Sequence, residues 1–243
     1  MSLFFVVGAA YSAVRDEIFH CDLVKESNDK EHHKILRDTD AYHIYPLALR
    51  GIPRTDSESK KDRDFFVKAI SAAIRKVNEF VLEQRKLVLL VQEKRRQSQK
   101  LTAEESVQFV KICHFYQTTN INELLLRVAP VPVSLAVAQA ALESRFGSDK
   151  LIHKLNAYFG LAQSETRLVR FDTLFNSVIA YVKTLNVNPV YREFREQRAV
   201  MMKKEVKLDG VKLAAYIGKY GEDKNYRKLV SEIIRLHKLS ALD

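Results

Sequence analysis

The chain has 243 residues, of which 47% are hydrophobic and 29% are charged, which is ordinary for a globular protein and sufficient for a substantial core. Its net charge of +10 and pI of about 9.5 favour an anionic partner: a nucleic acid, a membrane surface or an acidic cell-wall polymer. The two cysteines, Cys21 and Cys113, form no CxxC pattern, which argues against metal binding through cysteine. One disulfide is allowed, but two free thiols are favoured because the sequence does not bring the pair into contact.

Residues 1–55 are interpreted as an N-terminal segment, and residues 56–243 as the main helical domain. Residues 3–13 form a short, mostly apolar run that falls far below the length of a membrane span. No Lys or Arg precedes this run, so two interpretations stay open: the remains of an export signal, or a first strand or helix of the folded protein. Histidines between residues 15 and 40 lie near acidic residues, but they have no recognised ligand spacing and no metal is expected.

Residues 62–96 are predicted to form a long helix, because apolar side chains keep to one face at helical spacing. These side chains are Phe65, Ile70, Ile74, Val77, Val81 and Val88. The sequence Thr-Ala-Glu-Glu at 102–105 is a capping box, which predicts a second helix over 103–116. Residues 120–123 open a third, short helix that leads into the central segment.

The central segment spans residues 131–147. Pro130 and Pro132 prevent a helix from running through from upstream, while Ser134 suits a cap or first-turn position. Apolar and small residues then recur at helical spacing, which predicts a helix that is buried on most sides. Gly147 suits the left-handed residue that ends such a helix.

Glu143 is the only ionisable residue of this helix before its final turn. It would lie at the negative end of the helix dipole, where the ionised carboxylate is disfavoured. If Phe146, Tyr158 and Phe159 pack nearby, desolvation also raises the pKa of the carboxyl group. A carboxylic acid that keeps its proton near neutral pH is what a glycosidase uses to protonate a leaving oxygen. The plain alternative is a solvated glutamate at the end of a helix.

Beyond residue 160 the strand signal is weak. Residues 161–171 are predicted to form a short hairpin-like lobe, and an amphipathic helix follows over 172–185 with Asp172 as its acidic cap. Further helices are expected over the remaining chain, at 190–201, 211–216 and 226–238. The predicted class is therefore mainly α with a small β element.

The sequence Ala-Gln-Ala-Ala-Leu-Glu-Ser-Arg-Phe-Gly-Ser at 138–148, with Asn-Ala-Tyr-Phe-Gly at 156–160, resembles the catalytic core of bacterial peptidoglycan glucosaminidases of the Bax-type branch. The family pattern reads Ala-Gln-x-x-x-Glu-Ser-x-Trp-Gly and continues with Asn, Phe and Gly. The resemblance covers roughly residues 52–243 and implies a lysozyme-like helical domain with its small β element beside a cleft. The chain departs from the family in two ways: Phe146 stands where the family has Trp, and the segment after Gly160 is shorter than the family's β-rich lobe.

The resemblance implies hydrolysis of the β-1,4 bond after N-acetylglucosamine in peptidoglycan, with Glu143 as the general acid. It implies a substrate-binding set around that acid: Phe146, Asn156, Tyr158, Phe159 and Gly160. Two routes complete the reaction: a second carboxylate activates water, for which Glu165 is the candidate base, or the substrate's own acetamido group attacks. Tyr220 matches the first Tyr of the late family motif Tyr-Ala-Thr-Asp-Pro-x-Tyr, and it is expected beside the acid.

Two rival interpretations stay open. A protein that kept the fold but lost catalysis would bind or organise the cell wall, and Phe146 and the short lobe motivate this interpretation. A basic helical nucleic-acid binder rests on charge alone, without a recognisable helix-turn-helix or RNA-binding signature, so no nucleic-acid partner is expected. The resemblance implies a periplasmic or cell-envelope location, glycan strands as the partner, no transmembrane span and no cofactor.

Overall fold

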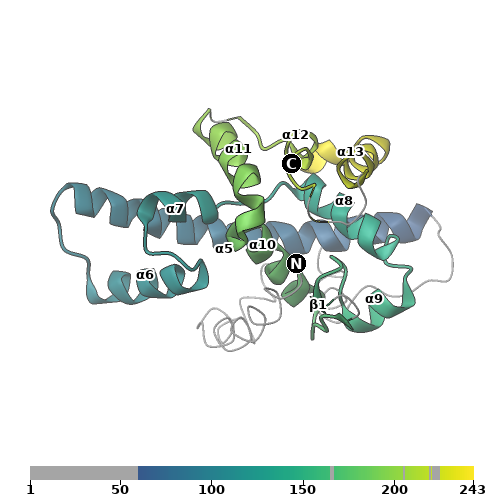
Figure 1. Cartoon of the computed structure of the whole chain (residues 1–243), viewed down its shortest axis with the longest axis horizontal. Coiled ribbons are helices and arrows are strands. Elements are labelled where there is room, and N and C mark those ends of the chain that lie inside the picture. Colours follow the sequence, from purple (N-terminus) through teal and green to yellow (C-terminus); the bar gives the residue numbers. More distant parts are fainter. Residues whose placement is uncertain (1–59, 165–166, 205, 219, 221–224) are drawn as a thin grey trace. The chain divides into compact units, whose positions relative to one another are not determined.

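The computed structural model describes residues 60–164, 167–204, 206–218, 220 and 225–243, and within them the chain is mainly α-helical (Figure 1). This confirms the predicted class. The helices are α5 (Lys60–Arg96), α6 (Ala103–Phe115), α7 (Ile121–Arg127), α8 (Val133–Ser144), α9 (Lys150–Leu155), α10 (Leu174–Val187), α11 (Arg192–Lys203), α12 (Gly210–Ala214) and α13 (Tyr226–Leu236), with 3₁₀ turns η3 (Pro189–Tyr191) and η4 (Leu239–Leu242). The predicted N-terminal segment and Cys21 lie outside the described residues.

The predicted hairpin after residue 160 is present as two short antiparallel strands, β1 (Ala162–Ser164) and β2 (Arg167–Leu168). Ala162 pairs with Leu168, and the backbone of Val169 donates to the carbonyl of Leu161 at 2.8 Å. The strands make up a two-stranded sheet, so the β element is as small as the sequence indicated.

Contacts divide the chain into two compact units. Of the described residues, the first unit contains 60–74, 136–181 and Leu242, and the second contains 75–135, 182–241 and Asp243. The first unit has an apolar core built from α5, α8, α10 and the segment after α9: Phe66, Ile70, Ile74, Val137, Tyr158, Phe159, Phe171, Val178 and Tyr181. The second has its own core: Val81, Val88, Phe109, Ile112, Leu124, Val128, Leu185, Phe194, Leu213, Ile217, Val230 and Ile234.

The long helix α5 confirms the prediction over 62–96, with one change in its buried face. Phe66 is completely buried, whereas Phe65 is only half-buried. The reason is the helical repeat, since Phe66 lies four residues before Ile70 and therefore shares its face. The remaining predicted face is buried along both units, as in Ile74 and Val88.

Of the two caps expected downstream, the capping box is confirmed, and the helix that residues 120–123 were expected to open is also present. Thr102 Oγ1 accepts from the backbone of Glu105 at 3.1 Å while Glu105 Oε2 accepts from the backbone of Thr102 at 2.7 Å, which is the predicted capping box. Asn120 caps α7 by accepting from the backbone of Glu123 at 3.0 Å. The expectation for Asp172 is wrong, because the neighbouring Thr173 accepts from the backbone of Asn176 at 3.1 Å and starts α10.

The connection from α7 to α8 is held by buried polar side chains of the second unit. Arg198 is completely buried and donates to the carbonyls of Leu126 at 2.8 Å and Pro130 at 3.2 Å, and to Asn186 Oδ1 at 2.7 Å. Asn186 in turn donates to the carbonyl of Ala129 at 3.1 Å. Unpaired buried carbonyls are costly, so these side chains fix the backbone that leads into α8.

The carboxylate of Asp243 binds both the first turn of α8 and the start of α12, within the second unit. The carboxylate of Asp243 accepts from the backbone of Ser134 at 2.7 Å, from its hydroxyl at 2.6 Å, and from the backbone of Gly210 at 3.1 Å. A Cβ on Gly210 would stand 2.1 Å from Ser134 Oγ and 2.9 Å from the backbone nitrogen of Leu135. The close approach therefore requires glycine at this position.

Candidate active site

Glu143 lies at the point where the buried helix α8 reaches the surface. Every residue from 136 to 141 is at most 1% exposed, and the alanines among them leave room for close neighbours. Glu143 itself is half-buried, one residue before the helix ends at Ser144. A half-buried carboxyl group on a rigid, buried helix is suited to a fixed chemical role.

The turn after α8 is strained. Arg145, Phe146 and Gly147 have φ values of 50°, 54° and 82°, so three successive residues are left-handed. This confirms the prediction for Gly147, although the left-handed stretch begins two residues earlier. Each non-glycine residue costs about 1–2 kcal/mol in this conformation. Hydrogen bonds hold the turn: Phe146 donates to the carbonyl of Ala141 at 3.0 Å, and Gly147 donates to Ser144 Oγ at 2.9 Å.

Gly160 lies directly against Glu143. Its φ is +63°, and an added Cβ would stand 2.6 Å from Glu143 Oε2 and 3.1 Å from its Cδ. Both the backbone conformation and the close approach therefore require glycine. The resemblance places Gly160 in the substrate-binding set, and in the structure the group next to its missing side chain is the carboxyl of Glu143. The two sequence motifs thus meet at one place.

Asn156 joins the end of α9 to the segment that follows the hairpin. Its own φ is 51°, and its Nδ2 donates to the carbonyls of Phe171 at 3.0 Å and Asp172 at 3.3 Å. Asn156 is half-buried. The helix α9 was not predicted, although Asp149 carried the signal: its Oδ1 accepts from the backbone of Ile152 at 3.0 Å and caps the helix.

Two aromatic residues lie beneath this site. Tyr158 and Phe159 are both completely buried. Phe159 stacks on Tyr181 with ring centres 4.1 Å apart, and Tyr158 meets Phe66 edge-on at 6.3 Å. Phe66 also meets Phe146 edge-on at 5.8 Å, and Phe146 is half-buried. The rings of Tyr158 and Phe159 therefore support the site from below, while part of Phe146 reaches the surface.

Comparison with known proteins shows what the central and C-terminal part of the chain is similar to. Residues 120–239 match the family model described as mannosyl-glycoprotein endo-beta-N-acetylglucosaminidase, named Glucosaminidase. This part of the chain matches the glucosaminidase family. It is similar to protein bax of Escherichia coli (strain K12), with 33% identity over 119 residues, which confirms the Bax-type resemblance. That match covers 43% of this chain and 43% of the relative, so less than half of the relative's length is represented. No solved structure matches the chain.

The glucosaminidase match begins at residue 120 and is thus shorter than the stretch from residue 52 that the sequence indicated. Glu143, Asn156 and Gly160 all lie within it. The family is one of glycoside hydrolases by its name, and the half-buried Glu143 is an acidic group of the kind that such chemistry requires.

The other two expected catalytic residues are Glu165 and Tyr220. Glu165 lies outside the described residues. Tyr220 belongs to the second unit of the chain, where it stacks on Tyr226 at 5.8 Å and lies 6.1 Å from Tyr191, ring centre to ring centre. Tyr226 is 4% exposed and therefore belongs to the core.

Sequence reasoning missed a polar pair in the interior of the first unit. Tyr181 donates from its hydroxyl to Gln139 Oε1 at 2.8 Å, and both residues are completely buried. The signal was the Gln of the motif itself, a polar residue in the middle of an otherwise apolar helix. A buried amide needs a partner, so its position indicated a hydrogen-bonding group on a neighbouring helix.

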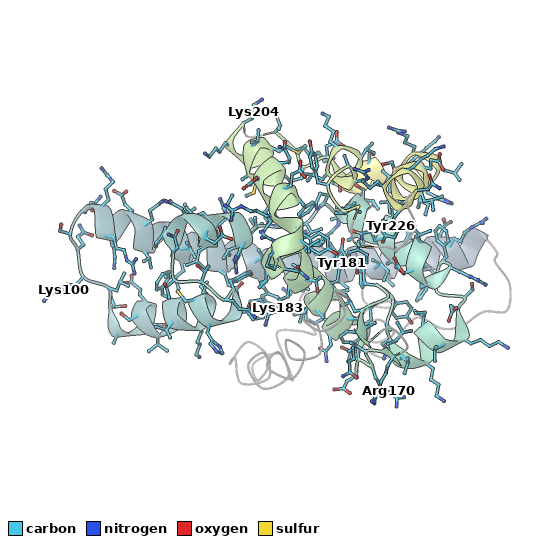
Figure 2. The ribbon with its side chains drawn as sticks, in the orientation of Figure 1. Lys100, Arg170, Tyr181, Lys183, Lys204 and Tyr226 are labelled. Carbon is cyan, nitrogen blue, oxygen red and sulfur yellow. The ribbon has the colours of Figure 1, made fainter. Side chains whose placement is uncertain are left out.

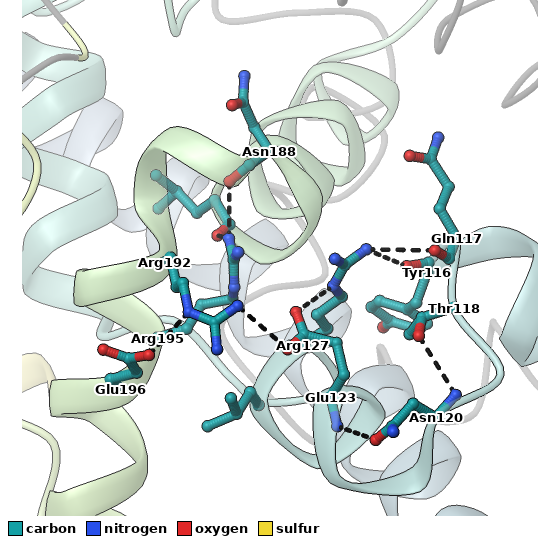
Figure 3. A network of polar contacts seen from close by, with 12 residues as sticks. Tyr116, Gln117, Thr118, Asn120, Glu123, Arg127, Asn188, Arg192, Arg195 and Glu196 are labelled. Atoms are coloured by element: carbon teal, nitrogen blue, oxygen red, sulfur yellow. Dashed lines mark hydrogen bonds and ion pairs between the residues drawn. The ribbon is translucent and has the colours of Figure 1, made fainter.

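Sequence reasoning also missed the arginine network of the second unit, shown in Figure 3. Glu123 accepts from Arg127 Nε at 2.8 Å and lies 3.8 Å from Arg192. Arg195 is 1% exposed and donates to the carbonyls of Leu185 and Asn188, and burial lowers its pKa to about 10. These basic residues contribute to the net charge that predicted an anionic partner, but several of them instead bind groups inside the protein.

The described residues contain neither a candidate metal site nor a candidate membrane span. No group of three His, Cys, Asp or Glu residues comes together there as a metal site. Cys113 is a buried free thiol whose pKa is raised by burial. None of the described helices is long and apolar enough to cross a membrane.

Proposed function

We propose that the protein hydrolyses the β-1,4 bond after N-acetylglucosamine in peptidoglycan, with Glu143 as the general acid. The observation that carries this proposal is the approach of Gly160, where an added Cβ would stand 2.6 Å from Glu143 Oε2. Two motifs that are separate in sequence thereby build one site around a carboxyl group. General acid catalysis needs a proton donor held in a fixed place, and the buried helix α8 holds it.

The expected substrate-binding residues take different parts in this proposal. Phe146 is half-buried and offers ring surface for a sugar, in the place where the family has Trp. Asn156 uses its amide to hold the loop below the substrate. Tyr158 and Phe159 stabilise that loop from the core rather than contacting the glycan.

Two routes remain for the second half of the reaction. In an inverting enzyme a carboxylate about 6.5–9.5 Å from the acid activates water, and Glu165 is the candidate. In the substrate-assisted route the acetamido group attacks, and Tyr220 is the candidate to bind that group. Replacing Glu165 with Gln would lower turnover about 10²–10⁴-fold by the first route, with partial rescue by azide, and would change it only slightly by the second.

The test is turnover of purified sacculi by the full chain, its Glu143→Gln variant and a Glu193→Gln control. Glu193 is an exposed glutamate on α11, so this control removes one surface charge from the same domain. We expect Glu143→Gln to lose about 10²–10⁴-fold in turnover while folding and sacculus binding persist, and Glu193→Gln to match the wild type. Near wild-type turnover by Glu143→Gln would remove Glu143 from the mechanism.

A second candidate is a wall-binding protein without catalysis, which acts at the cell envelope like the hydrolase. It is favoured by Phe146 in place of Trp and by the brevity of β1 and β2. In that case the wild type and Glu143→Gln bind sacculi equally, and neither releases sugar fragments.

A further inference from the structure

The hydrogen bond between Tyr181 and Gln139 lies in the most buried part of the first unit. The hydroxyl of Tyr181, labelled in Figure 2, donates to Gln139 Oε1 at 2.8 Å, and neither side chain is exposed. The ring of Tyr181 is also fixed, because Phe159 stacks on it at an interplanar angle of 17°. A buried hydrogen bond between rigid groups keeps one geometry.

Gln139 precedes Glu143 by one helical turn on α8. Side chains four residues apart are neighbours on one face of a helix. The hydroxyl of Tyr181 donates to the amide oxygen of Gln139, and the donors of that amide are the two N–H groups on Nε2. A donor next to a carboxyl group binds its unprotonated oxygen, and the proton then resides on the other oxygen.

Tyr181 reaches the same carboxyl group by a second path. Phe159, which stacks on Tyr181, is followed directly by Gly160. Gly160 in turn lies against Oε2 of Glu143. The position of Tyr181 therefore affects both the helix that carries Glu143 and the loop that contacts it.

We propose that Gln139 and Tyr181 are positioning residues for Glu143. Tyr181 orients the amide of Gln139 so that an N–H group binds one oxygen of the Glu143 carboxyl, which fixes the oxygen that carries the proton. This inference rests on the proposed function, in which Glu143 delivers that proton to the leaving sugar.

The test uses Tyr181→Phe and Gln139→Met in the full chain. The titration of the Glu143 carboxyl is followed by ¹³C NMR of labelled glutamate, and its signal is assigned by its absence in Glu143→Gln. Gln139→Met removes the N–H donor, and Tyr181→Phe removes the hydroxyl that orients it. Either change weakens a hydrogen bond that favours the ionised carboxylate, so we expect the titration midpoint to rise by about half a unit or more in both variants. We expect kcat on sacculi to fall about tenfold with KM unchanged, because binding does not use these buried groups.

Tyr116→Phe is the matched control. Tyr116 is 1% exposed and donates to Gln84 Oε1 at 2.8 Å, so the control removes the same kind of buried hydrogen bond from the second unit. It should cost similar stability and leave the titration of Glu143 unchanged. If Tyr181→Phe and Gln139→Met shift the titration no more than Tyr116→Phe does, the positioning role is refuted. A wild type that releases no sugar fragments would refute the proposed hydrolysis instead, while the titration still decides the role of Gln139 and Tyr181.

Discussion

Replacing Gly160 with Ala would test the contact on which the candidate site depends. The new Cβ would stand 2.6 Å from Glu143 Oε2, whereas ordinary contact begins at 3.4 Å, so the oxygen must move by about 0.8 Å. A misplacement of about 1 Å can cost about 10²-fold in rate, so we expect kcat on sacculi to fall about 10–100-fold. Alanine at φ +63° also costs about 1–2 kcal/mol of stability, measured by urea unfolding.

A double-mutant cycle with Glu143→Ala separates the two effects. The three atoms nearest to the added Cβ all belong to Glu143, so Glu143→Ala removes the collision and leaves only the backbone cost. Because a carboxyl group can swing away, Gly160→Ala should lose nearly the same free energy of unfolding in both backgrounds. Unchanged kcat in Gly160→Ala, with the expected loss of stability, would show that the contact does not set the position of the acid.

Two further predictions concern the second unit. Gly210→Ala should destabilise the protein by about 3 kcal/mol in urea unfolding, and Ser134→Ala should relieve only part of this cost, because the backbone nitrogen of Leu135 also lies 2.9 Å from the new Cβ. Burial acts to raise the pKa of Glu123, but the hydrogen bond and charge of Arg127 lower it overall. The ion pair therefore stabilises the fold above the unfolded pKa of about 4.3 and is lost as the pH falls through the lower folded value. At pH 7 the free energy of unfolding of the wild type should exceed that of Glu123→Gln by about 1 kcal/mol. A difference between the two that persists at pH 2 would contradict this reasoning.

Much of the helical layout could be predicted because its signals are local. The capping box at Thr102 and the Asn120 cap each act within one helical turn, so the sequence carries all of the information. The short helix α9 was missed because its six residues give no clear period, and only Asp149 marked its start. The choice of Phe66 over Phe65 required the exact phase of α5, which a shift of one residue changes by about 100°.

The sequence by itself determined the class of the fold, the family and the identity of the candidate acid. Glu143 stands alone among apolar and small residues, and such a pattern is visible without coordinates. Only the tertiary structure decided what surrounds that acid, because contacts between distant segments leave no local period. It showed that Gly160 makes room for the carboxyl of Glu143, that Tyr181 meets Gln139, and that arginines such as Arg198 bind backbone carbonyls in the core. From sequence alone, a charged or polar side chain is expected at the surface. Its partner inside the protein is seen only in the folded structure.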